Sequence, residues 1–230
     1  MKKPVFYTEL AFLIGLTLLA FGTSLTAYGD IGISMVVAPA FVLHLFVSEF
    51  LPWFSFGVAE YVLQAFVLLV LILLLRKAKW SYLLSFCVTL LYGFALDGSM
   101  TLTAMLPKHI YFQIGAYIVG AVICCSALAL LFSSYFPPEA YELFSKEIAA
   151  KFHKPVHKIV NVYNLCSLLL AALLSLALFQ SIKGIGIGTV VCAFVYGFII
   201  QFFQTIYGKL FRFEDKFPWR SFFEENKKKQ

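Results

Sequence analysis

The residues best able to do chemistry in this sequence are a few acids, amides and tyrosines that interrupt long apolar runs. Glu60 and Gln64 stand four positions apart in one such run, as neighbours on one face of a helix do. An ionisable side chain inside a bilayer is costly, so each one there is a functional candidate. We expect a substrate-binding site formed by Glu60, Gln64, Tyr92, Asn161, Asn164 and Tyr196, with Glu60 and Asp97 as coupling groups.

Each of these residue types also has a plainer interpretation. Glu60 could sit near the rim of the membrane and pair with Lys183, and Asp97 could cap a helix or face water. The two asparagines could make hydrogen bonds between helices, and the two tyrosines could simply pack. The sequence favours Glu60 as the proton-coupling residue because it lies inside an apolar run.

Other familiar chemistries find no support in the sequence. His153 and His157 are four apart, but Pro155 between them argues against a shared helical face, and no third ligand follows. Glu139 and Glu142 fit the first turn of an amphipathic helix, where carboxylates complement the helix dipole. We therefore expect no metal, no cofactor, no catalytic residues and no enzyme activity, and no binding of nucleic acid.

The candidates must be positioned by membrane helices. The chain of 230 residues is 61% hydrophobic and 13% charged, and about 20 mostly apolar residues are needed to cross a bilayer. The sequence predicts an all-α polytopic membrane protein. Six segments are long and apolar enough to span: 10–28, 57–75, 81–97, 112–133, 159–181 and 185–208.

The basic residues predict the orientation of these spans. Of 18 lysines and arginines, all but Lys108 and Lys183 fall in segments that share one side if the chain crosses six times. Because cytoplasmic segments are enriched in Lys and Arg, we expect both termini to be cytoplasmic. Membrane lipids are then the first expected partners.

The sequence also predicts an internal duplication. Tyr92-Gly93-Phe94 recurs as Tyr196-Gly197-Phe198, and at the same offset of about 104 positions Glu60 corresponds to Asn164. An odd number of spans in each half would make the two halves inverted repeats, as in many transporters. The predicted regions are a first repeat at 1–107, a second repeat at 108–208 and a cytoplasmic basic and aromatic tail at 209–230.

Each half carries an additional short segment after its first span. The segment 137–151 alternates apolar and charged residues and predicts an amphipathic helix at the membrane interface. The segment 34–50 is more apolar and contains Pro39, so it could be re-entrant, interfacial or spanning.

Several motifs resemble the YczE-like bacterial integral membrane proteins, which are grouped with the YitT-like proteins. The resemblance covers about residues 10–210. Its motifs are FPPEAYELF at 136–144, VYNL at 162–165, GIGIGT at 184–189 and, in the first half, GISM at 32–35, APA at 38–40, SF at 85–86 and YGFALD at 92–97. It implies a location in the bacterial cytoplasmic membrane and a presumed transport role. That family often carries an acid where this chain has Asn164, so a charged role there is not expected.

These observations favour a small-solute secondary transporter or exporter that works by alternating access of the two repeats. The alternatives are a substrate-binding membrane subunit that needs an ATP-driven partner, and a membrane regulator or scaffold that transports nothing. The expected partners are an unidentified small-molecule substrate and, because the chain is short, a second copy of itself as a homodimer.

Overall fold

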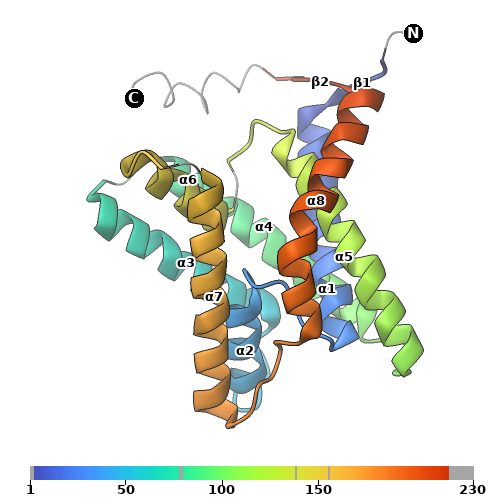
Figure 1. Ribbon diagram of the computed structural model, residues 1–230, viewed down its shortest axis with the longest axis vertical. Helices are drawn as coiled ribbons and strands as arrows, with labels where there is room; N and C mark the ends of the chain where they lie inside the picture. Colours follow the sequence, from blue (N-terminus) through green and yellow to red (C-terminus); the bar gives the residue numbers. More distant parts are fainter. Residues whose placement is uncertain (1–2, 78–79, 138, 155, 218–230) are drawn as a thin grey trace.

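The computed structural model describes residues 3–77, 80–137, 139–154 and 156–217 (Figure 1). Within these ranges the chain forms eight helices and two short strands. In chain order they are β1 Val5–Tyr7, α1 Thr8–Gly29, α2 Ala38–Val47, α3 Phe56–Leu75, α4 Trp80–Thr103, α5 Ile110–Phe132, α6 Ala140–Lys151, α7 Val156–Phe179, α8 Ile187–Leu210 and β2 Arg212–Glu214.

The long helices confirm a multi-pass membrane protein. Among the described residues, five helices are long and apolar enough to cross a bilayer: α1, α3, α4, α5 and α7. The ten-residue α2 is apolar but too short to cross, so the spanning alternative for the segment 34–50 is wrong. The predicted amphipathic helix at 137–151 is present as α6.

The third predicted span is longer than expected. We expected a helix over 81–97, but α4 continues to Thr103. Asp97 does not end it, because its side chain is bound to the start of α3: Oδ2 accepts a hydrogen bond from the Ser55 hydroxyl at 2.6 Å, and Oδ1 accepts one from the Gly57 N–H at 2.7 Å. A carboxylate held in this way can stay within a helix, and it caps the first turn of α3 as it does so.

Helices α1 and α5 pack extensively along each other (Figure 1). A Cβ atom at Gly22 would lie 2.7 Å from Cys124 Sγ and 2.9 Å from the Gly120 carbonyl oxygen, so only glycine allows this approach. The glycines of α1 face α5 in reverse order: Gly15 lies by Leu131, Gly22 by Cys124 and Gly29 by Tyr117. The two helices are therefore antiparallel.

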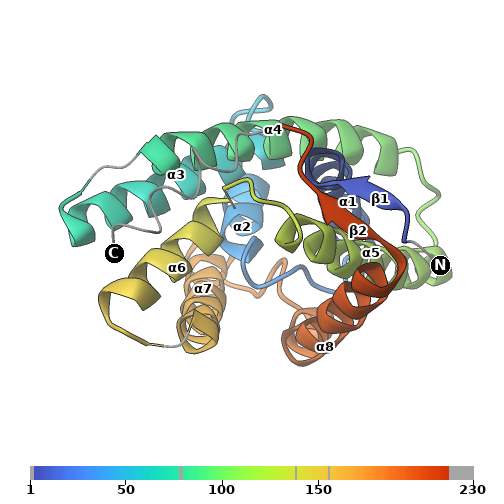
Figure 2. The same cartoon turned by 90° about the horizontal axis from the view of Figure 1, so that it is seen from above.

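The contacts of the other helices match between the two halves at most places (Figures 1 and 2). Helix α4 packs on α1, and α8 packs on α5. The short helix α2 lies against α3 and α7, and the short helix α6 lies against α7 and α3. The match fails at one place. Helix α3 packs along α4, whereas α7 and α8 stand apart in both views.

The helix ends gather into two groups. At one end, β1 pairs in parallel with β2, and the Lys151 ammonium donates to the Leu74 carbonyl at 2.6 Å. At the other end, the Tyr28 hydroxyl donates to the Pro107 carbonyl at 2.6 Å, and the N–H of Gly188 donates to the Ile31 carbonyl at 3.1 Å. The strand pair places the start of α1 and the end of α8 together. The predicted tail lies outside the described residues from position 218 onward.

Candidate functional site

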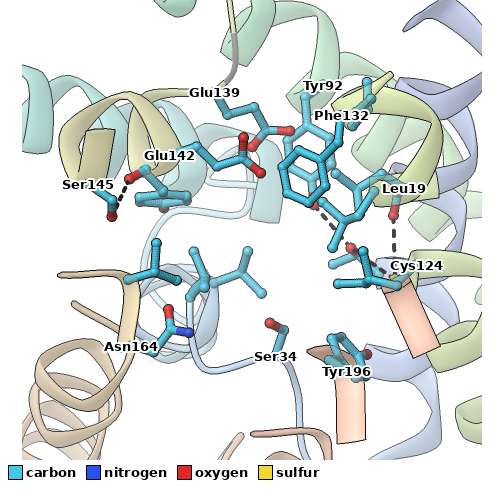
Figure 3. A pocket seen from close by; sticks show the side chains of 18 of the residues that line it. Leu19, Ser34, Tyr92, Cys124, Phe132, Glu139, Glu142, Ser145, Asn164 and Tyr196 are labelled. Carbon is cyan, nitrogen blue, oxygen red and sulfur yellow. Dashed lines mark hydrogen bonds between the residues drawn. The ribbon is translucent and has the colours of Figure 1, made fainter. Parts of the chain in front are cut away.

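A cavity of about 650 Å³ lies between the two halves of the chain (Figure 3). Its walls come from α1, the segment 34–37, α4, α5, α6, α7 and α8. Figure 3 shows Glu142 of α6 and Glu139, the residue just before α6, reaching in, with Asn164 and Ser34 on another side and Tyr196 facing them from α8. This volume lies in the range of small-molecule sites, which are concave and mostly apolar.

The wall between the cavity and α3 is a buried polar network. The Tyr141 hydroxyl donates to Glu60 Oε2 at 2.8 Å, and Gln64 Nε2 donates to the same oxygen at 3.1 Å. Gln64 Nε2 also lies 3.4 Å from Glu139 Oε2. One amide therefore bridges the carboxyl groups of Glu60 and Glu139.

The other end of that amide is also held in place. Gln64 Oε1 accepts hydrogen bonds from the Thr89 hydroxyl at 2.6 Å and from the N–H of Ala140 at 3.2 Å. These two donors fix which end of the amide carries the oxygen, so the NH₂ group must point at the two carboxyl groups. The network thus connects α3, α4 and the start of α6.

The two bridged carboxyl groups each keep one oxygen without a partner. Within the described residues, Glu60 Oε1 and Glu139 Oε1 are buried and make no hydrogen bond, and Glu60 is 0% exposed. Burial, and then the neighbouring charges of Glu60 and Glu142, raise the pKa of Glu139 to about 8. The two carboxyl groups are joined through the Gln64 amide, and two negative charges so placed repel each other, so Glu139 tends to keep a proton near pH 7.

The tyrosines of the repeated Tyr-Gly-Phe motif lie in different surroundings. Tyr92 is fully buried at the cavity wall, and its hydroxyl donates to Thr23 Oγ1 at 3.1 Å. Tyr196 is half-buried and borders the cavity from the side of α8 (Figure 3). Both predicted tyrosines therefore contact the cavity, from opposite halves of the chain.

The remaining lining is apolar and aromatic, with little charge. Among the described residues that line the cavity, the charged side chains are Glu139, Glu142 and Lys146. Lys146 lies 4.0 Å from Glu142 on the same helix, so the charges of these two offset each other. Glu139 is then the remaining acid of the lining. It faces a space bordered by aromatic side chains: Phe12, Phe132, Phe136, Tyr141, Tyr163 and Tyr196.

The predicted site residues divide into three groups. Tyr92, Asn161, Asn164 and Tyr196 border the cavity. Glu60 and Gln64 lie directly behind its wall and reach it through Tyr141 and Glu139. Glu60 is 0% exposed and binds Tyr141 and Gln64 in place of the alternative partner Lys183. Asp97 holds the start of α3 instead, so its contacts favour the capping interpretation over a coupling role.

Two residues of the network were missed from the sequence. Glu139 was interpreted as a helix-dipole carboxylate, yet its side chain lines the cavity. Tyr141 was interpreted as part of an apolar face, yet its hydroxyl binds Glu60. The only sequence signal was their place together in the motif FPPEAYELF.

The fold and the cavity define a class: a multi-pass helical membrane protein with a small-molecule-sized cavity between two similarly ordered sets of helices. The chain belongs to a family of unknown function, DUF6198, whose sequence model matches residues 6–205. No curated protein and no solved structure shows significant similarity to it. The resemblance to YczE-like proteins is neither contradicted nor extended by this match and stays a prediction.

Proposed function

We propose that this protein is a secondary transporter of a small solute that works by alternating access of two inverted three-span repeats. The observation that carries the proposal is the asymmetry of the cavity. The helix pair α7 and α8 stands apart and borders the cavity, while its counterpart, α3 and α4, is packed together. In an inverted repeat, exchange of these two arrangements opens the cavity to the opposite side.

Six spans are supported by the position of the chain ends. Because β1 and β2 pair, the start of α1 and the end of α8 lie on one side, which requires an even number of crossings. Five helices already qualify as spans. Helix α8 has 24 residues with Lys209 as its one charged side chain, and it supplies the sixth crossing.

Inversion of the two repeats is supported by the helix order and packing. Residues 1–107 and 108–208 each follow the order long helix, short helix, long helix, long helix. Their first helices, α1 and α5, are antiparallel. The short helices then lie on opposite sides of the membrane, α6 on the side of the termini and α2 on the other side.

The distribution of basic residues supports a cytoplasmic location for the termini and for α6. In this orientation the six-span topology places 16 of the 18 lysines and arginines in the cytoplasm, with Lys108 and Lys183 outside. The protein would then be a multi-pass component of the bacterial cytoplasmic membrane.

The test is a pair of symmetry-related cross-links. Tyr61 packs its ring against Gly93, and their counterparts at an offset of 104 positions are Leu165 and Gly197. In the arrangement seen here, Y61C/G93C should react with a short bifunctional thiol reagent and L165C/G197C should not. The exposed Cys87 and Cys166 are first replaced by serine.

Alternating access predicts that a transported solute, or its counter-ion, shifts the two cross-linking yields in opposite directions. Mass spectrometry of the cross-linked protein, reconstituted in liposomes, measures both yields. If L165C/G197C never cross-links under any condition, α7 and α8 do not close. The protein is then a binding subunit or a scaffold, and the transport proposal fails.

A further inference from the structure

The buried carboxyl pair has a feature that the transport proposal leaves unused. Glu60 and Glu139 share one amide donor, Gln64 Nε2, at 3.1 and 3.4 Å. Each pair member keeps an oxygen that is buried without a partner among the described residues. A buried acceptor left unpaired is destabilising, so the pair favours an arrangement in which a proton or a cation satisfies it.

The two acids have different access to the cavity. Glu60 is 0% exposed and does not border the cavity, whereas Glu139 does. Glu139 is therefore the acid that a cavity ligand meets, and Glu60 lies behind it. The other charged groups at the cavity, Glu142 and Lys146, lie 4.0 Å apart and leave the net charge of the lining negative when Glu139 is ionised.

The remaining walls suit an apolar body that carries a positive charge. Aromatic side chains from α1, α5, α6, α7 and α8 border the space beside Glu139, and ring faces attract cations. Helices α7 and α8 stand apart, and both border the cavity. Their outer faces carry exposed apolar residues such as Leu165 and Phe194. An apolar cation dissolved in the membrane is the kind of solute that this arrangement can admit.

We propose that the cavity binds a lipophilic organic cation, an amine or a quaternary onium ion, at Glu139, and that this cation displaces the proton held by the Glu139 carboxyl group. The displaced proton passes to water in the cavity. Cation and proton thus compete for one negative charge. This inference deepens the proposed transport function. Binding of the cation and release of the proton do not depend on that function, but their exchange across the membrane rests on it.

The titratable groups around the pair set the pH range of this competition. They are Tyr92 on α4, Cys124 on α5, Tyr141 and Glu142 on α6 and Tyr163 on α7. The tyrosines and the cysteine stay neutral near pH 7, so the carboxyl groups determine how cation binding depends on pH. Since the pKa of Glu139 is raised to about 8, cation binding below that pH must release a proton.

The experiment uses purified full-length protein in detergent and two probes of matched shape and opposite charge. Tetraphenylphosphonium should bind, and its affinity should rise roughly tenfold per pH unit between pH 6 and 7, levelling off above about pH 8. Calorimetry in buffers of different ionisation enthalpy should show about one proton released per cation bound. Tetraphenylborate, the anion of the same shape, should bind at least tenfold more weakly, because the cavity is acidic.

Two variants assign the effect to the pair. Glu139→Gln should abolish the pH dependence of tetraphenylphosphonium binding and the proton release. Glu147→Gln, on the same helix α6 but outside the cavity lining, should keep both. If Glu139→Gln does not fold, the comparison of the two probes over pH with the unaltered protein decides. Equal binding of cation and anion, or binding of the cation without proton release, would overturn the inference.

Failure of this inference can be told apart from failure of the transport proposal. If cation binding releases a proton but α7 and α8 never cross-link, the cation site is supported and the transport proposal fails. If the two cross-linking yields respond in opposite directions but the protein binds both probes equally, the transport proposal is supported and the cation site is overturned.

Discussion

Helices α3 and α4 of the first half are joined tightly, whereas the equivalent helices α7 and α8 of the second half stand apart. The sequence motif at the contact is the same: Tyr-Gly-Phe occurs on both α4 and α8. The difference is in the partner helix. Gly93 receives the ring of Tyr61, while the counterpart of Tyr61 is Leu165, and nothing lies within 4 Å of a Cβ built at Gly197.

This comparison shows that a repeated motif does not fix a repeated contact. The first half adds a second connection at the end of the helices, where Asp97 binds Ser55 and Gly57. At the equivalent place the second half has Gln201, which lines the cavity. The first half is therefore joined by polar contacts at this place, and the residue at the corresponding place in the second half borders the cavity instead.

The largest expected effect comes from filling the glycine of the closed pair. Gly93→Leu should push Tyr61 out of its place and destabilise the protein by about 1–3 kcal/mol, as overpacking does. Gly197→Leu is the matched control and should leave stability unchanged, since its side chain meets open space. Thermal unfolding in detergent measures both. Equal loss in the two variants would show that the pairs do not differ as described.

The next effect comes from removing the polar connection. Asp97→Ala deletes two hydrogen bonds to the start of α3 and should cost about 2 kcal/mol. Gln201→Ala, at the equivalent position, should change stability little. It should instead alter ligand binding, because Gln201 borders the cavity. A Gln201→Ala variant as unstable as Asp97→Ala would contradict the assignment of α7 and α8 as the open pair.

The last effect is a change in how stability depends on pH, and it concerns a slope over pH and not the stability at one pH. Glu139 has its pKa raised from 4.5 to about 8, so its folded form holds a proton that the unfolded chain has already lost. Stability should be highest below pH 4.5 and should fall as pH rises towards 8. Glu139→Gln should flatten this slope. A melting temperature with the same pH slope in both proteins would place the buried proton elsewhere.

The sequence predicted the helices far better than the site. Long apolar runs and the placement of lysine and arginine depend on local composition, and they located every long helix, although α4 extends six residues beyond the predicted end at Asp97. That error came from a tertiary contact. The Asp97 carboxylate accepts hydrogen bonds from Ser55 and Gly57 at the start of α3, and local composition cannot reveal such a contact.

The candidate site was predicted in part for a similar reason. Tyr92, Asn161, Asn164 and Tyr196 were chosen as polar residues in apolar helices, and all four border the cavity. Glu139 and Tyr141 lie on the short amphipathic helix, where an acid and a tyrosine are ordinary. Their role depends on which face of α6 is turned towards α3. That orientation is set by packing between residues far apart in the sequence: Glu60 and Tyr141, for example, are 81 positions apart.

The pairing of β1 with β2 has a consequence for the order of events during synthesis. Val5 and Arg212 are partners in the strand pair and are 207 positions apart. At translation rates of about 5–20 residues per second, the first strand waits roughly 10–40 s for its partner. Throughout that time the backbone groups of β1 remain available to other chains. The strand pair can therefore close only after α8 has been made, and a chain that stops before α8 has β1 without this partner.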